Sequence, residues 1–175
     1  MNDSNNNEEK LSVMGRYMMF AMWIVLLGLL SWFFYQWQQD QMNPNSTVAS
    51  MINNKGQTEV VLQANRQGQY HVSGTINNTP VVFLLDTGAN NVSIPGHVAE
   101  KIGLKKGYKI QFETANGSAT GYRTKIENIA IGGIVLNNIS ASINPNVNFD
   151  EILLGMSFLK HVEMIQKNNI LTLRY

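Results

Sequence analysis

Cysteine is absent from the 175-residue chain, and its absence excludes several kinds of chemistry at once. Without a thiol there is no disulfide framework, no cysteine nucleophile and no cysteine-based metal site. Histidine is scarce as well, and the three histidines are too scattered for paired-ligand spacing: His71, His97 and His161. A zinc hydrolase is therefore not predicted, and we expect neither a metal nor an organic cofactor.

The chain also lacks an excess of charge of either sign. The 13 Lys and Arg residues nearly balance the 12 Asp and Glu residues, which leaves a formal net charge of +1. Because nucleic-acid-binding domains carry strongly basic surfaces, no nucleic-acid partner is predicted. The lysines at positions 105, 106 and 109 form a small basic cluster, which we interpret as a solvated face rather than a phosphate site.

Charged residues are missing from one long stretch near the amino terminus, residues 17–35. A helix needs about 20 apolar residues to cross a bilayer core of roughly 30 Å, and this stretch is rich in Met, Leu, Ile, Val, Trp and Phe. Trp32, Tyr35 and Trp37 gather at its far end, as aromatic residues do at a membrane interface. We therefore predict a transmembrane helix over residues 17–37.

Two other structures are compatible with this apolar stretch. One is a buried helix of a soluble domain, and the stronger alternative is a cleaved signal peptide. The stretch is long for a signal peptide, and it ends in bulky Trp-Phe-Phe-Tyr rather than in the small residues of a cleavage site. An uncleaved anchor is the favoured interpretation.

The flanking basic residues predict the orientation of this anchor. Lys10 and Arg16 precede it, and no Lys or Arg follows until Lys55. By the positive-inside rule the amino terminus is expected in the cytoplasm and the rest of the chain outside. In a bacterium the chain would be a single-pass inner-membrane protein with its folded domain in the periplasm.

Composition divides the chain into four parts. Residues 1–16 are Asn-rich and acidic, so we expect a disordered cytoplasmic tail before the helix at 17–37. Residues 38–57 are rich in Gln, Asn, Ser and Thr and predict a flexible linker. Folded sequence is expected over residues 58–175, a length close to the commonest for a single domain.

Within this domain the hydrophobic pattern is mainly that of short strands. Strands and hairpins are predicted at 59–64, 69–76, 81–85, 108–126, 129–136, 140–143 and 170–174. Short helices are predicted at 95–102, where Gly103 would end the helix, and at 157–162. Many short strands with one or two short helices indicate a mainly β fold, closed or sandwich-like.

One aspartate stands directly after a continuous apolar run. Residues 82–85 are Val-Phe-Leu-Leu, and Asp86 follows them, with Thr87, Gly88 and Ala89 next. An ionised carboxylate beside a buried strand is costly unless it has a partner or a function. Thr87 can hydrogen-bond across a turn, and Gly88 lets another backbone approach closely. Asp86 is thus either a catalytic carboxylate or a structural residue, in a turn or at the cap of a helix that follows the strand.

Two features further along the chain favour the catalytic interpretation. Asn116-Gly117, the strongest short turn signal in a hairpin, lies about 30 residues after Asp86. The apolar run Leu153-Leu154-Gly155 follows about 70 residues after Asp86.

Taken in order, these pieces resemble the retropepsin-like aspartic proteases, in particular small bacterial members with a single domain and a membrane anchor. The likeness covers roughly residues 68–175, and the matching segments are Gly74-Thr75-Ile76-Asn77, Pro80–Ala89, Thr114-Ala115-Asn116-Gly117 and Ile152–Leu159. The resemblance implies a retropepsin-like half-barrel, mainly β with one or two short helices, preceded by one transmembrane helix.

The resemblance also implies roles for the residues around the aspartate. Asp86 would supply one of two catalytic carboxylates. Thr87 would lock the active-site loops across a dimer, and Gly88 would lie along the substrate backbone. Ala89 would complete the active-site loop.

Two further segments acquire roles by the same resemblance. Ala115, Asn116 and Gly117 would form a flap that folds over bound peptide. Two aromatic residues, Phe112 and Tyr122, flank this tip, and the sequence does not choose between them. The run Leu153, Leu154 and Gly155 would pack beside the catalytic loop.

Peptide hydrolysis by carboxylates needs one ionised group to accept a proton from water and one protonated group to polarise the carbonyl. Because one chain supplies one Asp-Thr-Gly, we expect a symmetric homodimer in which Asp86 faces its copy. Strands 59–64 and 170–174 are expected at the interface, since bare strand edges favour pairing. The predicted activity is that of an aspartic endopeptidase acting on peptide or protein substrates. The alternatives are a non-catalytic peptide-binding module of the same fold and a purely structural β domain.

Other candidate catalytic residues are less favoured. Asp150 and Glu151 precede the Leu-Leu-Gly run, but neither is followed by Thr-Gly, and we interpret both as solvated loop acids. The stretch Gly155-Met156-Ser157-Phe158 lacks the second glycine of a nucleophile elbow, so no serine hydrolase is predicted.

Overall fold

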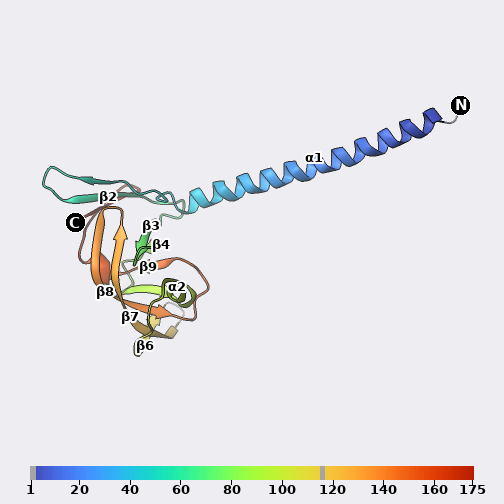
Figure 1. Cartoon of the computed structure of the whole chain (residues 1–175). Helices are drawn as coiled ribbons and strands as arrows, with labels where there is room; N and C mark the ends of the chain where they lie inside the picture. The colour runs from blue at the N-terminus through green and yellow to red at the C-terminus, as the bar shows by residue number, and fades with distance from the viewer. Residues whose placement is uncertain (1–2, 115–116) are drawn as a thin grey trace. The chain divides into compact units, whose positions relative to one another are not determined.

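The computed structural model describes residues 3–114 and 117–175, and the chain divides into two compact units. The first unit, Met1–Asp40, contains most of a single helix, α1 (Asp3–Met42), drawn in blue in Figure 1. The second unit, Gln41–Tyr175, contains all the strands and two short helices.

Helix α1 carries an apolar segment, Met14–Gln38, of 25 residues with a mean hydropathy of 2.0. This segment is long and apolar enough to cross a membrane, a property that a signal sequence shares. The helix begins at Asp3, whereas the sequence predicted a disordered tail over residues 1–16. No proline interrupts the chain before Pro44, which follows closely after the end of the helix.

Four antiparallel strands of the second unit form a small sheet. In spatial order they are β1 (Ser50–Ile52), β2 (Thr58–Gln63), β11 (Ile170–Arg174) and β10 (Glu163–Lys167). Strands β2 and β11 confirm two predicted strands, but they pair with each other, Val61 opposite Thr172. The sequence had led us to expect a bare edge on each of them that could pair in a dimer. Neither has one, because the unpredicted strands β1 and β10 flank them.

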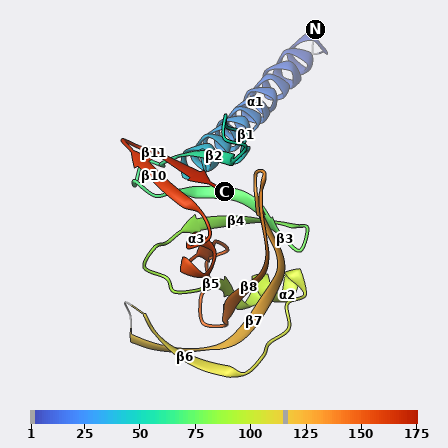
Figure 2. The same ribbon diagram turned by 90° about the vertical axis from the view of Figure 1, so that its left-hand side faces the viewer.

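The remaining strands form a larger sheet that closes on itself. Its order is β3 (His71–Ile76), β4 (Thr79–Leu85), β9 (Ile152–Leu154), β5 (Val92–Pro95), β8 (Ile134–Asn144), β7 (Gly117–Ile131) and β6 (Lys109–Thr114). Because β3 also pairs with β7, six of these strands make a ring, and β6 continues it as a hairpin with β7. Figure 2 shows this hairpin at the bottom of the view, at the far end of the domain from β10 and β11.

Two seams of this ring are narrow. Strands β3 and β7 join through two residue pairs, Thr75 with Ala130 and Ile76 with Ile129. Strands β5 and β9 join through one pair, Ser93 with Leu153. The long hairpin of β7 and β8 supplies the most extensive ladder.

The predicted linker over residues 38–57 is largely structured. Besides β1, it contains Asn45, a residue that is 5% exposed and whose side chain bridges β2 and β3. The Asn45 amide donates to the carbonyl oxygens of Gln63 (2.9 Å) and His71 (2.6 Å) and accepts from the Gln63 N–H (2.7 Å). The compact unit therefore begins near Gln41 rather than at residue 58, because one amide side chain satisfies backbone groups of two strands.

The hydrophobic core combines side chains of the ring and of the small sheet. Its largest fully buried members include Phe83, Phe158, Leu62, Ile76, Ile94, Ile126, Ile129, Ile131, Ile134, Ile143, Ile152 and Leu154. In the apolar run 81–85, predicted to be buried on both faces, Phe83 alone is fully buried and its neighbours are partly exposed. The outer side of β4 thus remains open in the isolated chain.

Two short helices complete the domain and confirm the predicted ones. Helix α2 (Gly96–Ile102) begins directly after Pro95 and ends at Gly103, whose φ of 80° is the left-handed conformation that glycine favours. Helix α3 (Met156–Leu159) follows directly after Gly155. Both expected helices, the strand content and the ring agree with a mainly β half-barrel.

Candidate active site

Asp86 lies where the chain leaves β4. Its backbone N–H donates to the carbonyl oxygen of Leu154 (3.2 Å), which extends the parallel pairing of β4 and β9 by one residue. Its carboxylate Oδ1 accepts a hydrogen bond from the N–H of Gly88 (2.9 Å). This is the local turn that an aspartate side chain forms with the backbone two residues on. The carboxylate is therefore held in one orientation while it remains partly exposed.

The loop from Asp86 to Asn91 (the Asp86 loop) packs against the chain leaving β9. The N–H of Met156 donates to the carbonyl oxygen of Ala89 (2.7 Å). A Cβ on Gly155 would lie 2.5 Å from that same oxygen and closer still to the oxygen of Asn91, so only glycine fits there. The structure thus brings the predicted run Leu153-Leu154-Gly155 and the Asp86 loop into direct contact.

Ser157 adds a second connection between these segments. Its N–H donates to the carbonyl oxygen of Asn90 (3.0 Å), and its Oγ accepts from the N–H of Val92 (3.0 Å). The hydroxyl therefore supports the far end of the Asp86 loop. The sequence predicted that Ser157 is not a nucleophile, but its role in supporting the loop has no local signal, since Ser157 and Val92 are 65 positions apart.

Two residues of the Asp86 loop point to a surface that the chain does not cover by itself. Thr87 and Gly88 are exposed, and within residues 3–114 and 117–175 the Thr87 hydroxyl has no hydrogen-bond partner. Leu84 and Leu85 beside them are only partly buried. Apolar strand residues and an unpartnered hydroxyl next to a carboxylate form a surface suited to contact with another molecule.

The predicted flap corresponds to the hairpin of β6 and β7. Ala115 and Asn116 lie outside the described residues, and Gly117 begins β7 with a φ of 103°. Phe112 lies opposite Ala119 in the hairpin, and its ring reaches diagonally to Gly121, where a Cβ would be 2.7 Å from the ring atom Cε1. The ring fills the space left by this glycine, a pairing that supports strands containing glycine. Tyr122, the other aromatic candidate, has the Lys106 ammonium 5.8 Å from its ring centre.

Among residues 3–114 and 117–175, the strand register places neither of the other candidate carboxylates, Asp150 and Glu151, beside Asp86. Because β4 and β9 run parallel, Asp86 follows the ends of both strands, whereas Asp150 and Glu151 precede the start of β9. The four residue-to-residue steps from Asp150 to Leu154 span about 13 Å at a strand's rise per residue. Asp150 instead contacts His97 on α2, Oδ1 to Nε2 at 2.7 Å.

The lysines at positions 105 and 106 contribute to an open hollow of about 650 Å³ elsewhere on the domain. Its lining is basic and polar: Asn77, Gly103, Leu104, Lys105, Lys106, Gly107, Tyr108, Arg123, Thr124, Lys125, Glu127, Asn138 and Ser140. Asp86 is not part of it, so the hollow is separate from the candidate catalytic residues. Across the described residues, no group of three or more His, Asp and Glu side chains gathers as a metal site would require.

Comparison with known proteins agrees with this architecture. Residues 72–161, just over half of the chain, match the family model of the gag-polyprotein putative aspartyl protease. An uncharacterized protein of Sinorhizobium, from the cobV 5' region, is 34% identical over 158 residues, which cover 83% of this chain and 67% of that protein. An uncharacterized protein of Rickettsia prowazekii is 26% identical over 147 residues, 80% of this chain and 63% of that protein. The chain spans about two thirds of the length of these relatives.

A solved structure shows the same fold. The crystal structure of a retropepsin-like aspartic protease from Rickettsia conorii superposes with a TM-score of 0.58 and 25% sequence identity, covering 74% of this chain and 96% of that one. The predicted half-barrel is confirmed by this match. From the family model, the related sequences and the shared fold, the chain belongs to the retropepsin-like aspartic protease family.

Proposed function

We propose that this protein is a membrane-anchored aspartic endopeptidase whose active site forms between two identical chains. The observation that carries the proposal is the position of Asp86: one carboxylate per chain, oriented by the Gly88 N–H and held at an uncovered surface. Thr87, Gly88 and Ala89 support it in the Asp86 loop, and the run Leu153-Leu154-Gly155 packs behind it.

The chemistry follows from pairing two such carboxylates. One Asp86 is ionised and takes a proton from a water molecule, which attacks the peptide carbonyl carbon. The Asp86 of the second chain is protonated and donates to the carbonyl oxygen, so the dyad stabilises the tetrahedral intermediate. Two carboxyls about 3 Å apart share one proton because both cannot be ionised at that distance.

The uncovered surface beside Asp86 supports a dimeric site. Leu84 and Leu85 are partly exposed, and apolar surface is costly to leave in water, while the exposed hydroxyl of Thr87 can bond to a second chain. A second chain would cover these groups and supply the missing carboxylate. The flap hairpins, including Ala115, Asn116 and Gly117, would then hold an extended peptide above the dyad.

The apolar segment Met14–Gln38 supports membrane anchoring. With Lys10 and Arg16 before it, the amino terminus lies in the cytoplasm and the protease domain in the periplasm. Confinement to one membrane plane raises the effective concentration of the two chains, which favours a weak dimer. The substrates are extended segments of peptides or proteins on that side of the membrane.

Substitution of Asp86 tests the proposal. Full-length Asp86→Asn in detergent should lose peptide hydrolysis about 10³-fold or more, because proton transfer by the dyad contributes 10²–10⁴-fold or so. Asp150→Asn is the matched control, since this exposed carboxylate contacts His97. Peptide cleavage by Asp86→Asn at the parental rate would show that Asp86 is not catalytic.

A further inference from the structure

We propose that the open hollow beside β7 (the basic hollow) binds an acidic segment of a protein substrate, at a distance from the candidate catalytic residues. The ligand is an extended peptide segment with carboxylates at alternate positions. The inference rests on the proposed function in one respect, namely that the molecule carrying this segment is then cleaved. The binding of the segment itself does not depend on Asp86.

Four cationic side chains line the basic hollow, which has a volume of about 650 Å³. Lys105 and Lys106 lie in the loop between α2 and β6, and Arg123 and Lys125 lie on β7. Among the described residues that line the hollow, Glu127 is the one carboxylate. The surface is therefore suited to an anionic ligand.

The loop that carries the two lysines is fixed to β7. The N–H of Gly107 donates to the carbonyl oxygen of Arg123 (2.8 Å), and the N–H of Arg123 donates to the carbonyl oxygen of Tyr108 (2.9 Å). A Cβ on Gly107 would lie 2.7 Å from the Arg123 oxygen, so glycine permits this approach. The hydroxyl of buried Thr124 donates to the carbonyl oxygen of Lys105 (2.9 Å). Because the loop is held before a ligand arrives, binding has a smaller ordering cost.

Within residues 3–114 and 117–175, three of the four cations make no ion pair: Lys105, Arg123 and Lys125. The fourth, Lys106, contacts Glu100, Nζ to Oε1 at 3.1 Å. Like charges that gather without partners repel one another, and an anionic ligand removes this repulsion. The basic hollow thus has cations available to a ligand.

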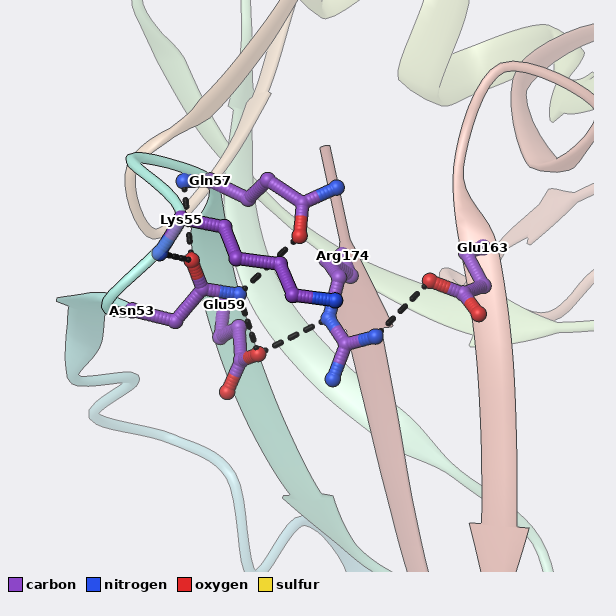
Figure 3. Close-up of polar contacts among 6 residues, drawn as sticks. All are labelled: Asn53, Lys55, Gln57, Glu59, Glu163 and Arg174. Carbon is purple, nitrogen blue, oxygen red and sulfur yellow. Dashed lines mark hydrogen bonds and ion pairs between the residues drawn. The ribbon is translucent and has the colours of Figure 1, made fainter.

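The charged cluster of the small sheet differs in this respect. Figure 3 shows Arg174 between two carboxylates, with Nε 2.8 Å from Oε1 of Glu59 and Nη1 2.9 Å from Oε2 of Glu163. This cation is paired within the chain. Charge alone therefore does not mark a binding site, and the basic hollow is distinguished by charges that the described chain leaves uncompensated.

The spacing of the cations on β7 favours an extended peptide. Arg123 and Lys125 flank the buried Thr124, so their side chains lie on the outer face of the strand, about 7 Å apart. Alternate residues of an extended peptide have the same spacing. Carboxylates at every second position therefore match the two cations, whereas one phosphate ion is too small to contact both. The volume of the hollow also lies within the range of about 300–1,000 Å³ that is typical of ligand sites.

Side chains, rather than strand pairing, would hold this peptide. The N–H and the carbonyl oxygen of Arg123 are both bonded to the loop, and the other side of this stretch pairs with Ala141 and Ser140 of β8. The backbone of β7 is thus occupied on both sides here. Polar side chains of Asn138 and Ser140 add hydrogen-bonding groups to the lining.

Strand β7 connects the basic hollow to the predicted flap. From Gly117 to Arg123 the strand makes six residue-to-residue steps, which span about 20 Å. A segment bound in the hollow is therefore near enough to the flap to belong to the same substrate chain as a peptide beneath it. Binding at the hollow would raise the effective concentration of the segment to be cleaved.

Peptide binding to an inactive protein tests the site. The probe is a fluorescent peptide of alternating Glu and Ser, titrated into full-length Asp86→Asn in detergent and followed by fluorescence anisotropy. Addition of Arg123→Gln and Lys125→Gln should weaken binding about tenfold, because two charge-assisted contacts are lost. Lys125→Gln alone, at an exposed position, should cause a smaller loss in the same direction.

A charge-matched variant is the control. Lys55→Gln combined with Lys160→Gln removes the same net charge at two exposed lysines outside the basic hollow. It should retain the affinity of Asp86→Asn for the acidic peptide. An equal loss of affinity in the two double variants would overturn the inference, because net charge alone would then explain the binding.

Two further probes test the ligand class. A peptide with Gln in place of every Glu should bind at least about tenfold more weakly, since it lacks the charges that the cations attract. Sodium phosphate should displace the acidic peptide no better than sodium chloride of equal ionic strength. Equal binding of the two peptides, or stronger displacement by phosphate than by chloride, would overturn the assignment to an acidic peptide.

A cleavage assay on the parental protein connects the site to the substrate. An acidic extension on a cleavable peptide should lower KM about fivefold and leave kcat unchanged, because the added contacts are the same in the ground state and the transition state. Arg123→Gln with Lys125→Gln should abolish this advantage while cleavage of the unextended peptide is retained. An extension that leaves KM unchanged would overturn the assignment of the ligand to a substrate.

The outcomes separate this inference from the proposed function. Acidic-peptide binding that does not weaken in Arg123→Gln with Lys125→Gln would overturn the inference, even if peptide hydrolysis is intact. Binding that depends on the basic hollow, in a parental protein that cleaves no peptide, would support the site and count against the peptidase. A lower KM that depends on the same two cations supports both.

Discussion

Gly155 lies against the carbonyl oxygen of Asn91 so closely that position 155 has no room for a methyl group. The contact joins two segments that are far apart in the sequence, the Asp86 loop and the end of β9. Because both obstructing atoms, the oxygens of Asn91 and Ala89, belong to the backbone, they cannot move aside as a flexible side chain would. The geometry of Asp86 therefore depends on a residue that carries no functional group.

Gly155→Ala should accordingly damage both folding and activity. Insertion of a methyl group into a packed site costs about 1–3 kcal/mol, and here it also displaces the loop that holds Asp86. We expect a lower unfolding temperature and a loss of peptide hydrolysis, measured by thermal unfolding and a cleavage assay on the full-length protein. Gly15→Ala is the control, since a Cβ there meets nothing within 4 Å. Parental stability and activity in Gly155→Ala would contradict this reasoning.

Ser157→Ala separates a structural hydroxyl from a nucleophile. The substitution leaves the N–H of Val92 without its acceptor, which should lower the free energy of unfolding by about 1 kcal/mol. Peptide hydrolysis should be reduced but retained, because the hydroxyl supports the Asp86 loop and does not attack the substrate. Ser157→Thr keeps the oxygen and should recover much of the loss. Abolition of activity in a stably folded Ser157→Ala would instead point to a serine nucleophile.

Asn45→Ala tests whether the segment before β1 belongs to the folded domain. The substitution removes the partners of three backbone groups of Gln63 and His71, and each unsatisfied buried group costs about 1–3 kcal/mol. We expect a loss of roughly 2 kcal/mol or more in chemical denaturation. Asn54→Ala changes an exposed asparagine and should have little effect. Equal stability of the two variants would restore the view of this segment as a linker.

The ion pairs of Arg174 predict a pH dependence of stability. Hydrogen bonds from Asn53 and then from Arg174 lower the pKa of Glu59 below its usual value. A carboxylate with a lowered pKa in the folded state stabilises the fold above its unfolded pKa of about 4.3, and this contribution is lost as the pH falls through the folded value. Glu59→Gln should therefore be less stable than the parent at pH 7, with the difference shrinking below about pH 4.

Thermal unfolding of the parent and Glu59→Gln across this pH range measures the effect. Glu127→Gln, a change of an exposed carboxylate on β7, is the control. A stability difference that is constant from pH 7 to pH 3 would show that the Glu59 charge contributes nothing.

Much of the ring could be predicted from the sequence because its elements have strong local signals. The apolar run before Asp86 became β4, and Gly103 ends α2 with the positive φ that such a position requires. The turn at Gly132-Gly133 joins β7 and β8 as expected. These signals lie within a few residues of the elements that they specify.

The strands that flank the small sheet could not be predicted, because their pairing is not encoded in their own pattern. In β10, Met164 and Ile165 are adjacent rather than alternating, and the strand exists because Asn168-Asn169 turns the chain back onto β11. Asn45 is similar: its neighbours have the composition of a linker, and its contacts lie 18 and 26 residues away.

The candidate site likewise combines features that have a local sequence signal with features that depend on long-range contacts. Motif order identified Asp86 and the run at Leu153-Leu154-Gly155, because a known family has both. Their contact, however, depends on the parallel pairing of β4 with β9, which joins residues about 70 positions apart. The support from Ser157 and the contact of Asp150 with His97 are also long-range, so the sequence alone did not reveal them.

Strands β5 and β9 share a single residue pair, so the ring is closed at that seam mainly by the hydrogen bonds of the Asp86 loop to Met156 and Ser157. The same loop therefore carries the candidate catalytic aspartate and closes the barrel. Substitutions in the loop that increase the turnover rate would tend to weaken the contact between β5 and β9. Substitutions that raise thermal stability at this seam would tend to reduce the mobility of Asp86. In directed evolution of this protein, we expect the conflict between activity and stability to appear first at residues 86–92.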